Sequence, residues 1–203
     1  MKENYDKLML ETIADLKNTP KLLLHSCCAP CSTYCIKELS EHYLVTVFYY
    51  NPNIDTVSEY NLRAKEQQRY IAEFRAKNKV EFLESEYTPS EFEEIAIGRE
   101  NLPERGERCF LCYKLRLERT AKVAKESGFD YFATTLTLSP LKDAEKINVI
   151  GANLEKVYNI KYLPSDFKKR EGYKQSLELS KEYKLYRQNY CGCKYSKRGE
   201  NGI

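Results

Sequence analysis

The chain has no apolar run long enough to cross a membrane, and this absence sets a first limit on its class. Its 203 residues are 42% hydrophobic and 31% charged, and no apolar stretch approaches the ~20 residues of a transmembrane helix. The opening segment, MKENYDKLMLETIADLK, is charged throughout, so we expect no signal peptide. Together these absences predict a soluble, globular, cytoplasmic protein.

Glycine-rich loops and histidine are also scarce. The sequence has no glycine-rich phosphate cradle, so nucleotide hydrolysis is not expected. Of the two histidines, His25 ends an apolar run, where it is either a structural hydrogen-bonding group or a proton donor; His42 is expected to have no special role. Repeats, low-complexity tracts and linkers are missing as well. We therefore expect residues 1–203 to form a single domain.

Cysteine, by contrast, is abundant, and it is clustered. The cytoplasm keeps thiols reduced, so eight cysteines there indicate metal or redox chemistry rather than a disulfide framework. They fall into three groups along the chain: Cys27, Cys28, Cys31 and Cys35; Cys109 and Cys112; Cys191 and Cys193.

The hydrophobic pattern alternates between strand and helix signals. Short apolar or β-branched runs predict strands at 21–25, 43–50, 79–84 and 130–136. Helical spacing and capping signals predict helices over 5–17, 33–41, 57–78, 91–97, 112–127, 143–158 and 173–187. This alternation predicts an α/β fold, a parallel sheet flanked by helices. Ligands of such folds bind beyond the carboxyl ends of the strands, which is where HSCCAPCSTYC, residues 25–35, begins.

The first two cysteine groups are suited to binding metal. The CFLC segment, residues 109–112, opens a predicted helix, whose free N–H groups and dipole favour thiolates. If Cys27 and Cys28 meet this pair, four thiolates surround one centre, which suits zinc and an iron–sulfur cluster equally well. Seven or eight thiols exceed one tetrahedral site, so we expect a redox function in addition. Cys35 is expected to pack within its helix.

The third group, CGC, differs in kind. Gly192 lets the thiols of Cys191 and Cys193 approach each other, and a disulfide closed over one residue would be strained and easily reduced. These features predict a dithiol relay. The alternative is that one or both cysteines are metal ligands.

The charge of the chain is unevenly distributed. Residues 161–198 contain eleven Lys and Arg residues against four acids, a net charge of +7, whereas the whole chain carries only +3. Six tyrosines are interleaved with these cations. The segment is either a surface for a polyanion such as RNA or a solvated helical face. We therefore distinguish an α/β core of about 20–160 from a basic, Tyr-rich C-terminal segment, 161–198.

Six segments, in order along the chain, resemble the QueH family of cobalamin-independent epoxyqueuosine reductases. They are LLHSCCAPCS, FYYNPNI, ERCFLCYKLRLERTA, TTLTLSPLKD, LPSDFKKREGY and YCGCKYS. The resemblance implies an adenine-nucleotide α-hydrolase-like (HUP-type) domain. It also implies two-electron reduction of the epoxide of epoxyqueuosine in the anticodon loop of tRNA, giving queuosine, with electrons from a reductant protein.

The resemblance further implies roles for individual residues. Cys27, Cys28, Cys109 and Cys112 would bind a [4Fe-4S] cluster, Cys31 a possible second iron ion, and Cys191 with Cys193 would form a redox-active, disulfide-forming pair. Lys168, Lys169 and Arg170 are the candidate contacts to tRNA phosphates. Candidate proton donors to the epoxide oxygen are Asp143, Tyr113, His25 and Asp166. Two other functions remain open: a zinc-stabilised RNA-binding domain and a thiol-based tRNA sulfur transferase.

Overall fold

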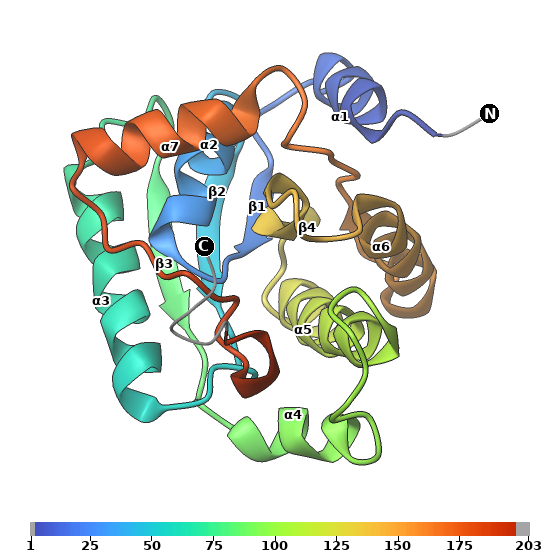
Figure 1. Cartoon of the computed structure of the whole chain (residues 1–203). Helices are drawn as coiled ribbons and strands as arrows, with labels where there is room; N and C mark the ends of the chain where they lie inside the picture. Colours follow the sequence, from blue (N-terminus) through green and yellow to red (C-terminus); the bar gives the residue numbers. More distant parts are fainter. Residues whose placement is uncertain (1–2, 198–203) are drawn as a thin grey trace.

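A five-stranded, all-parallel sheet in the order β3-β2-β1-β4-β5 forms the centre of the protein (Figure 1). The computed structural model describes residues 3–197. Four strands fall where the apolar runs predict them, and a fifth, two-residue strand completes the edge: β1 Lys21–His25, β2 Leu44–Tyr49, β3 Val80–Glu84, β4 Tyr131–Thr134 and β5 Lys161–Tyr162. The predicted α/β class is thus confirmed, and the strand order is consistent with a HUP-type fold.

Helices cover both faces of the sheet, because the side chains of β1 alternate between two apolar clusters. Leu22 and Leu24 pack in one cluster with side chains of α1, α2 and α3, whereas Leu23 packs with α5 and α6. Within residues 3–197, no helix combines the length and the apolar character needed to cross a membrane. The helices are α1 Tyr5–Ala14, α2 Ala29–Leu39, α3 Val57–Glu73, α4 Pro89–Ala96, α5 Glu107–Glu126, α6 Ala144–Tyr158 and α7 Gly172–Glu182.

Four helix boundaries differ by four or five residues from those predicted, and two of these differences bring cysteines into helix starts. α2 begins at Ala29 rather than at 33, because Pro30 lies in its first turn, where a missing N–H costs nothing. α5 begins at Glu107 rather than at 112, so Cys109 lies in its first turn. Conversely, α3 ends at Glu73 and α7 at Glu182, each about five residues earlier than expected.

The order of the strands reverses at β1, and this reversal positions the site. From β1 the chain proceeds outward to β2 and β3, then crosses to β4 on the opposite side of β1. The carboxyl ends of β1 and β4 therefore lie side by side, with chain leaving each in a different direction. Such a switch point leaves a crevice, and the residues that follow β1 are Ser26, Cys27 and Cys28.

We expect Gly151→Ala in α6 to lower the free energy of unfolding by about 1–3 kcal/mol, because the added methyl group would overlap the ring of Tyr162. That ring cannot move freely, since its buried hydroxyl donates to Asn148 Oδ1 at 3.2 Å. Urea denaturation measures the effect, with the exposed Asn153→Ala of the same helix as the control. A Gly151→Ala protein as stable as the wild type would contradict this packing.

Candidate metal and redox site

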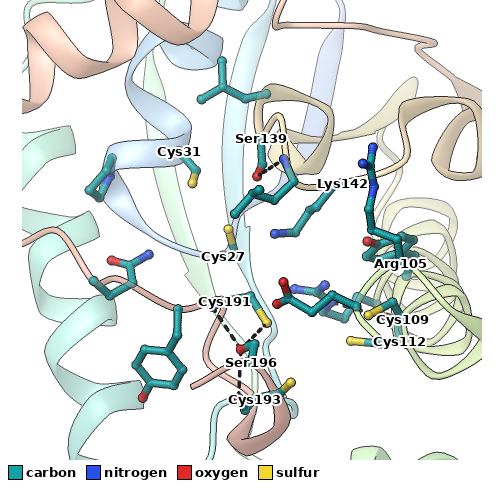
Figure 2. Close-up of a pocket in the computed structure, with 18 of the residues that line it drawn as sticks. Cys27, Cys31, Arg105, Cys109, Cys112, Ser139, Lys142, Cys191, Cys193 and Ser196 are labelled. Carbon is teal, nitrogen blue, oxygen red and sulfur yellow. Dashed lines mark hydrogen bonds between the residues drawn. The ribbon is translucent and has the colours of Figure 1, made fainter. Parts of the chain in front are cut away.

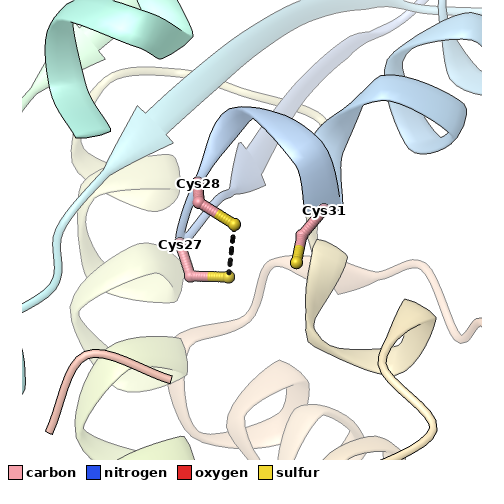
Figure 3. A group of neighbouring side chains, drawn as sticks. All are labelled: Cys27, Cys28 and Cys31. Atoms are coloured by element: carbon pink, nitrogen blue, oxygen red, sulfur yellow. Dashed lines mark hydrogen bonds between the residues drawn. The ribbon is translucent and has the colours of Figure 1, made fainter. Parts of the chain in front are cut away.

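Three thiols gather where β1 turns into α2. Cys28 is the N-cap residue of that helix and Cys31 lies in its first turn, so the turn brings both side chains to the side of Cys27. The three sulfur atoms lie within 4.8 Å of one another, and Cys27 Sγ is 3.8 Å from Cys28 Sγ (Figure 3). This thiol triad (Cys27, Cys28, Cys31) is the tightest group of metal-ligand side chains in residues 3–197.

Four more thiols face the same cavity from two other elements. Cys109 and Cys112 project from the first turns of α5, and Cys191 and Cys193 come from the loop after α7 (Figure 2). All eight cysteines are free thiols. Cys35 lies outside the cavity, fully buried, with its thiol donating to the Cys31 carbonyl oxygen at 3.5 Å. The cavity is therefore lined by six of the eight cysteines, with members from all three sequence clusters, and Cys28 lies beside it in contact with Cys27.

The donor set matches a thiolate-bound metal. Three sulfurs within 4.8 Å of one another have the spacing of ligands around one ion. The further thiols of α5 line the opposite wall of the same cavity. Soft thiolates select zinc, copper(I) or iron–sulfur clusters over hard oxygen-binding ions. Cys31 belongs to the tight group itself, and residues 28–31, CAPC, have the C-x-x-C spacing of paired metal ligands.

Three cations offset the negative charge of these thiols. Arg63 and Arg116 are 1% and 3% exposed, respectively, and Lys142 is half-buried with its side chain directed toward Cys27 (Figure 2). The pKa of Cys27 is lowered well below its usual range, first by hydrogen bonds from the Cys28 and Cys31 thiols and then by the charges of Lys142 and Arg116, against the opposing effect of burial. Among the three thiols, Cys27 is therefore the one whose surroundings most favour the thiolate.

The pKa values of the other two triad thiols, Cys28 and Cys31, are shifted upward. Hydrogen bonding with Cys27 raises the pKa of Cys28 to about 12 and also raises the pKa of Cys31. Across the cavity, burial raises the pKa of Cys112 to about 11. A bound cation is what would ionise several of these thiols together, because ligation displaces their protons.

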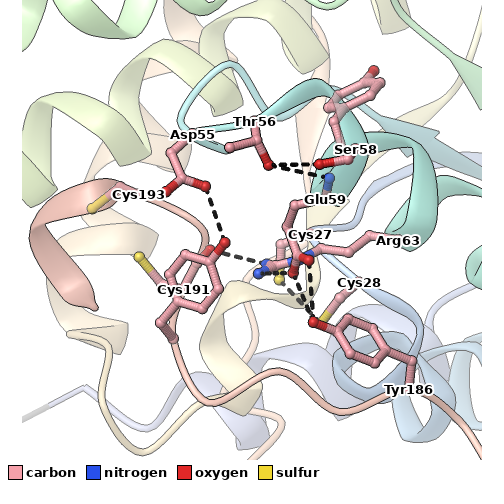
Figure 4. Close-up of polar contacts among 12 residues, drawn as sticks. Cys27, Cys28, Asp55, Thr56, Ser58, Glu59, Arg63, Tyr186, Cys191 and Cys193 are labelled. Carbon is pink, nitrogen blue, oxygen red and sulfur yellow. Dashed lines mark hydrogen bonds and ion pairs between the residues drawn. The ribbon is translucent and has the colours of Figure 1, made fainter. Parts of the chain in front are cut away.

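The CGC loop is held against the loop that follows β2. Arg63 Nη1 donates to the Cys191 carbonyl oxygen at 3.3 Å, and Asp55 N donates to the Gly192 carbonyl oxygen at 3.0 Å (Figure 4). Gly192 has φ +111°, and a Cβ atom there would lie 2.9 Å from Ile54. Glycine is therefore required at this position both by the backbone conformation and by the close approach.

Ser196 organises the two thiols of this loop. Its Oγ lies 3.0 Å from Cys191 Sγ, accepts from Cys191 N at 3.2 Å, and donates to the Cys193 carbonyl oxygen at 2.9 Å. The hydrogen bond from Cys193, and more weakly that from Ser196, lower the pKa of Cys191, whereas the pKa of Cys193 is raised. The pair therefore consists of one readily ionised thiol and one that retains its proton.

Of the four candidate proton donors, the structure brings only Tyr113 into the thiol cavity. His25 is fully buried below it, where its ring nitrogens lie 3.0 Å from Thr134 Oγ1 and 3.2 Å from the Tyr50 carbonyl oxygen. Burial, with Arg116 nearby, lowers the pKa of His25 to about 3, so the ring is neutral. Asp143 caps α6 by accepting from Lys146 N, and Asp166 pairs with Lys168; both line a separate, neighbouring pocket.

The three candidate phosphate contacts lie in different surroundings. Arg170 pairs with Asp6 at 3.1 Å and with Glu38 at 2.9 Å. Lys168 pairs with Asp166 and also donates to the Thr137 carbonyl oxygen at 3.2 Å. Lys169 is exposed at the rim of the neighbouring pocket. The positive charge of Lys169 is thus the one most open to an external anion.

Sequence reasoning missed the residues that control the charge and shape of the site. Lys142 is presented by a turn in which Leu141 N donates to Ser139 Oγ at 3.3 Å and Lys142 N to the Ser139 carbonyl oxygen at 3.2 Å. Its place soon after β4 is a signal that could have indicated it, since switch-point residues follow strand ends. Arg63 carries no such signal, because its partner Cys191 lies more than a hundred residues away. Ser196 carries none either, because it lies in a loop whose sequence has no periodic pattern.

Fold and site together define a class: an α/β protein that gathers reduced thiols and cations at its switch point, an arrangement suited to metal and redox chemistry. The sequence matches the family described as "Epoxyqueuosine reductase QueH" over residues 22–199. The chain therefore belongs to the QueH family of epoxyqueuosine reductases, which are oxidoreductases.

Individual relatives support this membership. The chain is similar to the epoxyqueuosine reductase QueH of Streptococcus pyogenes serotype M1, with 46% identity over 96% of this chain and 78% of the relative. Its identity to the protein of the same name from Staphylococcus epidermidis is 45%, over 96% of this chain and 85% of the relative. The Thermotoga maritima protein of that name is 35% identical over 86% and 89%, respectively.

We expect Arg63→Met to release the CGC loop and to lower the free energy of unfolding by about 3–5 kcal/mol, because Glu59 loses its buried partner at 2.7 Å. The guanidinium also lies 5.1 Å from the centre of the Tyr190 ring. Chemical denaturation measures the stability, and mass spectrometry after brief alkylation measures the expected faster labelling of Cys191.

The matched control for this prediction is Lys65→Met on the same helix. Lys65 is exposed, so its loss should change the free energy of unfolding by less than about 0.5 kcal/mol and leave Cys191 labelling unchanged. Equal effects of the two substitutions would show that Arg63 does not hold the loop.

Proposed function

We propose that the protein reduces the epoxide of epoxyqueuosine in tRNA to the alkene of queuosine, in the cytoplasm, using an iron–sulfur site. The observation that carries the proposal is the convergence of six free thiols on one cavity at the switch point of the sheet, with the Cys28 thiol beside them. Membership of the QueH family supplies the substrate, since the relatives are named for that reaction.

The proposed metal ligands are Cys27, Cys28, Cys109 and Cys112, for a [4Fe-4S] cluster. Cys31 is the proposed ligand of an additional iron ion. The closeness of Cys31 to Cys27 and Cys28 supports a metal-binding role for it. A cluster of this kind supplies electrons singly, and an iron ion with an open position supplies a Lewis acid for the epoxide oxygen. Arg116 and Lys142 lie where they can offset the charge of the ligands.

Cys191 and Cys193 are the proposed source of the two electrons that the reaction consumes. Converting an epoxide to an alkene breaks two C–O bonds, forms one C=C bond, consumes two electrons and two protons, and releases water. Oxidation of two thiols to one disulfide releases two electrons and two protons. The low pKa of Cys191 makes it the more reactive thiol of the pair, and a reductant protein would restore the dithiol.

Lys142 and Tyr113 are the proposed partners of the epoxide oxygen. Both line the thiol cavity, and the Lys142 side chain is directed toward Cys27. An ammonium group and a phenol can each donate a hydrogen bond to an oxygen as it acquires negative charge, which stabilises the transition state. The other candidates lack this position: His25 is enclosed by the sheet, and Asp143 and Asp166 line the neighbouring pocket.

The tRNA backbone is proposed to lie along the basic C-terminal segment. Lys169 is the best-placed of the three phosphate candidates because it is exposed, whereas Lys168 and Arg170 already have carboxylate partners. Tyr173, 38% exposed, lines the thiol cavity and offers a ring on which a base displaced from a loop can stack.

The test is oxygen-free purification followed by incubation with epoxyqueuosine-containing tRNA and a low-potential reductant. A brown protein with broad absorption near ~400 nm, and a product nucleoside lighter by one oxygen, would support the proposal. One zinc ion in a colourless, inactive protein would instead indicate an RNA-binding domain. Gain of sulfur by the tRNA would indicate a sulfur transferase.

Cysteine substitutions separate the roles of the three clusters. We expect Cys109→Ala to abolish both colour and turnover, because it removes a ligand, and Cys191→Ala to keep the colour but lose turnover. Cys35→Ala is the matched control, since this thiol lies outside the cavity, and it should keep both. Absorption spectra and nucleoside mass analysis provide the measurements; a colourless Cys191→Ala protein would make Cys191 a ligand.

We expect Lys142→Met to reduce turnover by about 10²–10⁴-fold while colour and tRNA binding persist, because the departing oxygen loses a donor. Lys142→Arg retains the positive charge and should recover part of the rate. Single-turnover kinetics at saturating tRNA measure the effect. If Lys142→Met loses colour in proportion to activity, the lysine supports the metal site rather than the substrate oxygen.

A further inference from the structure

Gln188 presents an unpaired acceptor in the thiol cavity. Its Oε1 atom is buried, and within residues 3–197 it has no hydrogen-bond partner. Gln188 lines the same cavity as Cys27, Cys31 and Cys191. A few other described side chains also have a buried, unpaired polar atom, but none of those residues lines this cavity.

The backbone on both sides of Gln188 is anchored, so its position is determined by the fold. Two residues before it, Tyr186 N donates to Glu66 Oε1 at 3.0 Å, and the Tyr186 hydroxyl lies 3.1 Å from Glu59 (Figure 4). Two residues after it, the Tyr190 hydroxyl donates to Asp55 Oδ1 at 3.0 Å. These contacts hold the chain on either side of Gln188 against α3 and against the loop that follows β2.

An acceptor buried without a partner costs free energy, because it has given up its hydrogen bonds to water. Leucine has a similar volume and would avoid this cost. A carboxamide in a reactive cavity is therefore favoured when a ligand brings the missing donor. The chemical class of that donor is an N–H or O–H group of the molecule that reacts at the thiols.

We propose that the Gln188 carboxamide accepts a hydrogen bond from the modified nucleoside of the substrate and thereby selects it; this rests on the proposed function. Two parts of that nucleoside can supply the donor. The guanine-type base has ring and exocyclic N–H groups on its pairing edge, which become available once the base leaves the stack. The epoxide-bearing side chain carries hydroxyl groups and the amine N–H that joins it to the base. Gln188 is a binding residue in this scheme; the electrons and protons of the reaction come from other groups.

A first test uses the ligand-free protein, in which the proposal predicts an unusual stability effect. Gln188→Leu should unfold at the same temperature as the wild type or at a higher one, because an unpaired buried acceptor has been removed. A purely structural glutamine would lower the unfolding temperature when replaced. Gln68→Leu, at an exposed glutamine of α3, is the matched control for the substitution itself.

A second test measures reduction of epoxyqueuosine-containing tRNA. Gln188→Leu should lower kcat/KM by about 10- to 100-fold, mainly through KM, with the colour of the protein unchanged. Gln68→Leu should remain within about twofold of the wild type, since surface substitutions of this kind have small effects. Unchanged kcat/KM in an active Gln188→Leu protein, or a loss of stability in the first test, would overturn the proposal.

Two competitive inhibitors identify the donor. If 7-deazaguanosine, which lacks the side chain of queuosine, inhibits Gln188→Leu more weakly than the wild type, the donor is on the base or its ribose. If only queuosine nucleoside loses affinity, the donor is in the side chain attached to the base. Equal inhibition of both proteins by both compounds would overturn the assignment to Gln188. A wild-type protein that binds queuosine nucleoside but does not reduce the tRNA would refute the proposed function, and direct binding of the two compounds to wild type and Gln188→Leu would then decide the assignment.

Discussion

The imidazole of His25 joins the three central strands directly below the thiols, and the geometry of the site depends on this bridge. One ring nitrogen reaches Thr134 at the end of β4, and the other reaches the carbonyl group of Tyr50 just after β2. Since the ring is buried and neutral, it fixes the separation of the strand ends without adding charge. The next residue continues the arrangement: Ser26 donates to Gln67 of α3 and its carbonyl oxygen accepts from Asn51. The chain therefore enters α2 along one path, which sets the position of Cys27.

Charge balance is the second constraint, and it links elements that are distant in sequence. The thiols come from α2, α5 and the loop after α7, whereas the cations come from α3, α5 and the turn after β4. Arg63 couples the two sets, because its charge lies near Cys27 and Cys28 and its N–H groups hold the carbonyl of Cys191. Removing such a cation would affect both the ionisation of the triad and the position of the redox pair.

The sequence predicts the fold of this protein better than it predicts the residues of the thiol cavity. The strand at 21–25 could be identified because a short apolar run between polar residues is typical of a buried strand. The start of α2 could not be predicted, because a proline interrupts a helix everywhere except in its first turn, which is where Pro30 lies. Cysteine clustering indicated which thiols converge. It did not indicate Arg63, Lys142 or Gln188. The chain has many lysines, arginines and side-chain amides, and only the folded structure shows which of them lie beside the thiols. The edge strand at 161–162 was missed for a simpler reason: two residues carry no periodicity.

The late position of the CGC loop in the chain has a consequence for biosynthesis. Its docking partners, Asp55 and Arg63, lie about 130 residues earlier, so the loop reaches them only after all five strands have left the ribosome. The thiol triad, by contrast, depends on a turn between neighbouring elements, β1 and α2. A growing chain would thus have the thiol triad in place well before Cys191 and Cys193 reach the same cavity. The wall of the cavity that the CGC loop provides is therefore added only when synthesis is nearly complete.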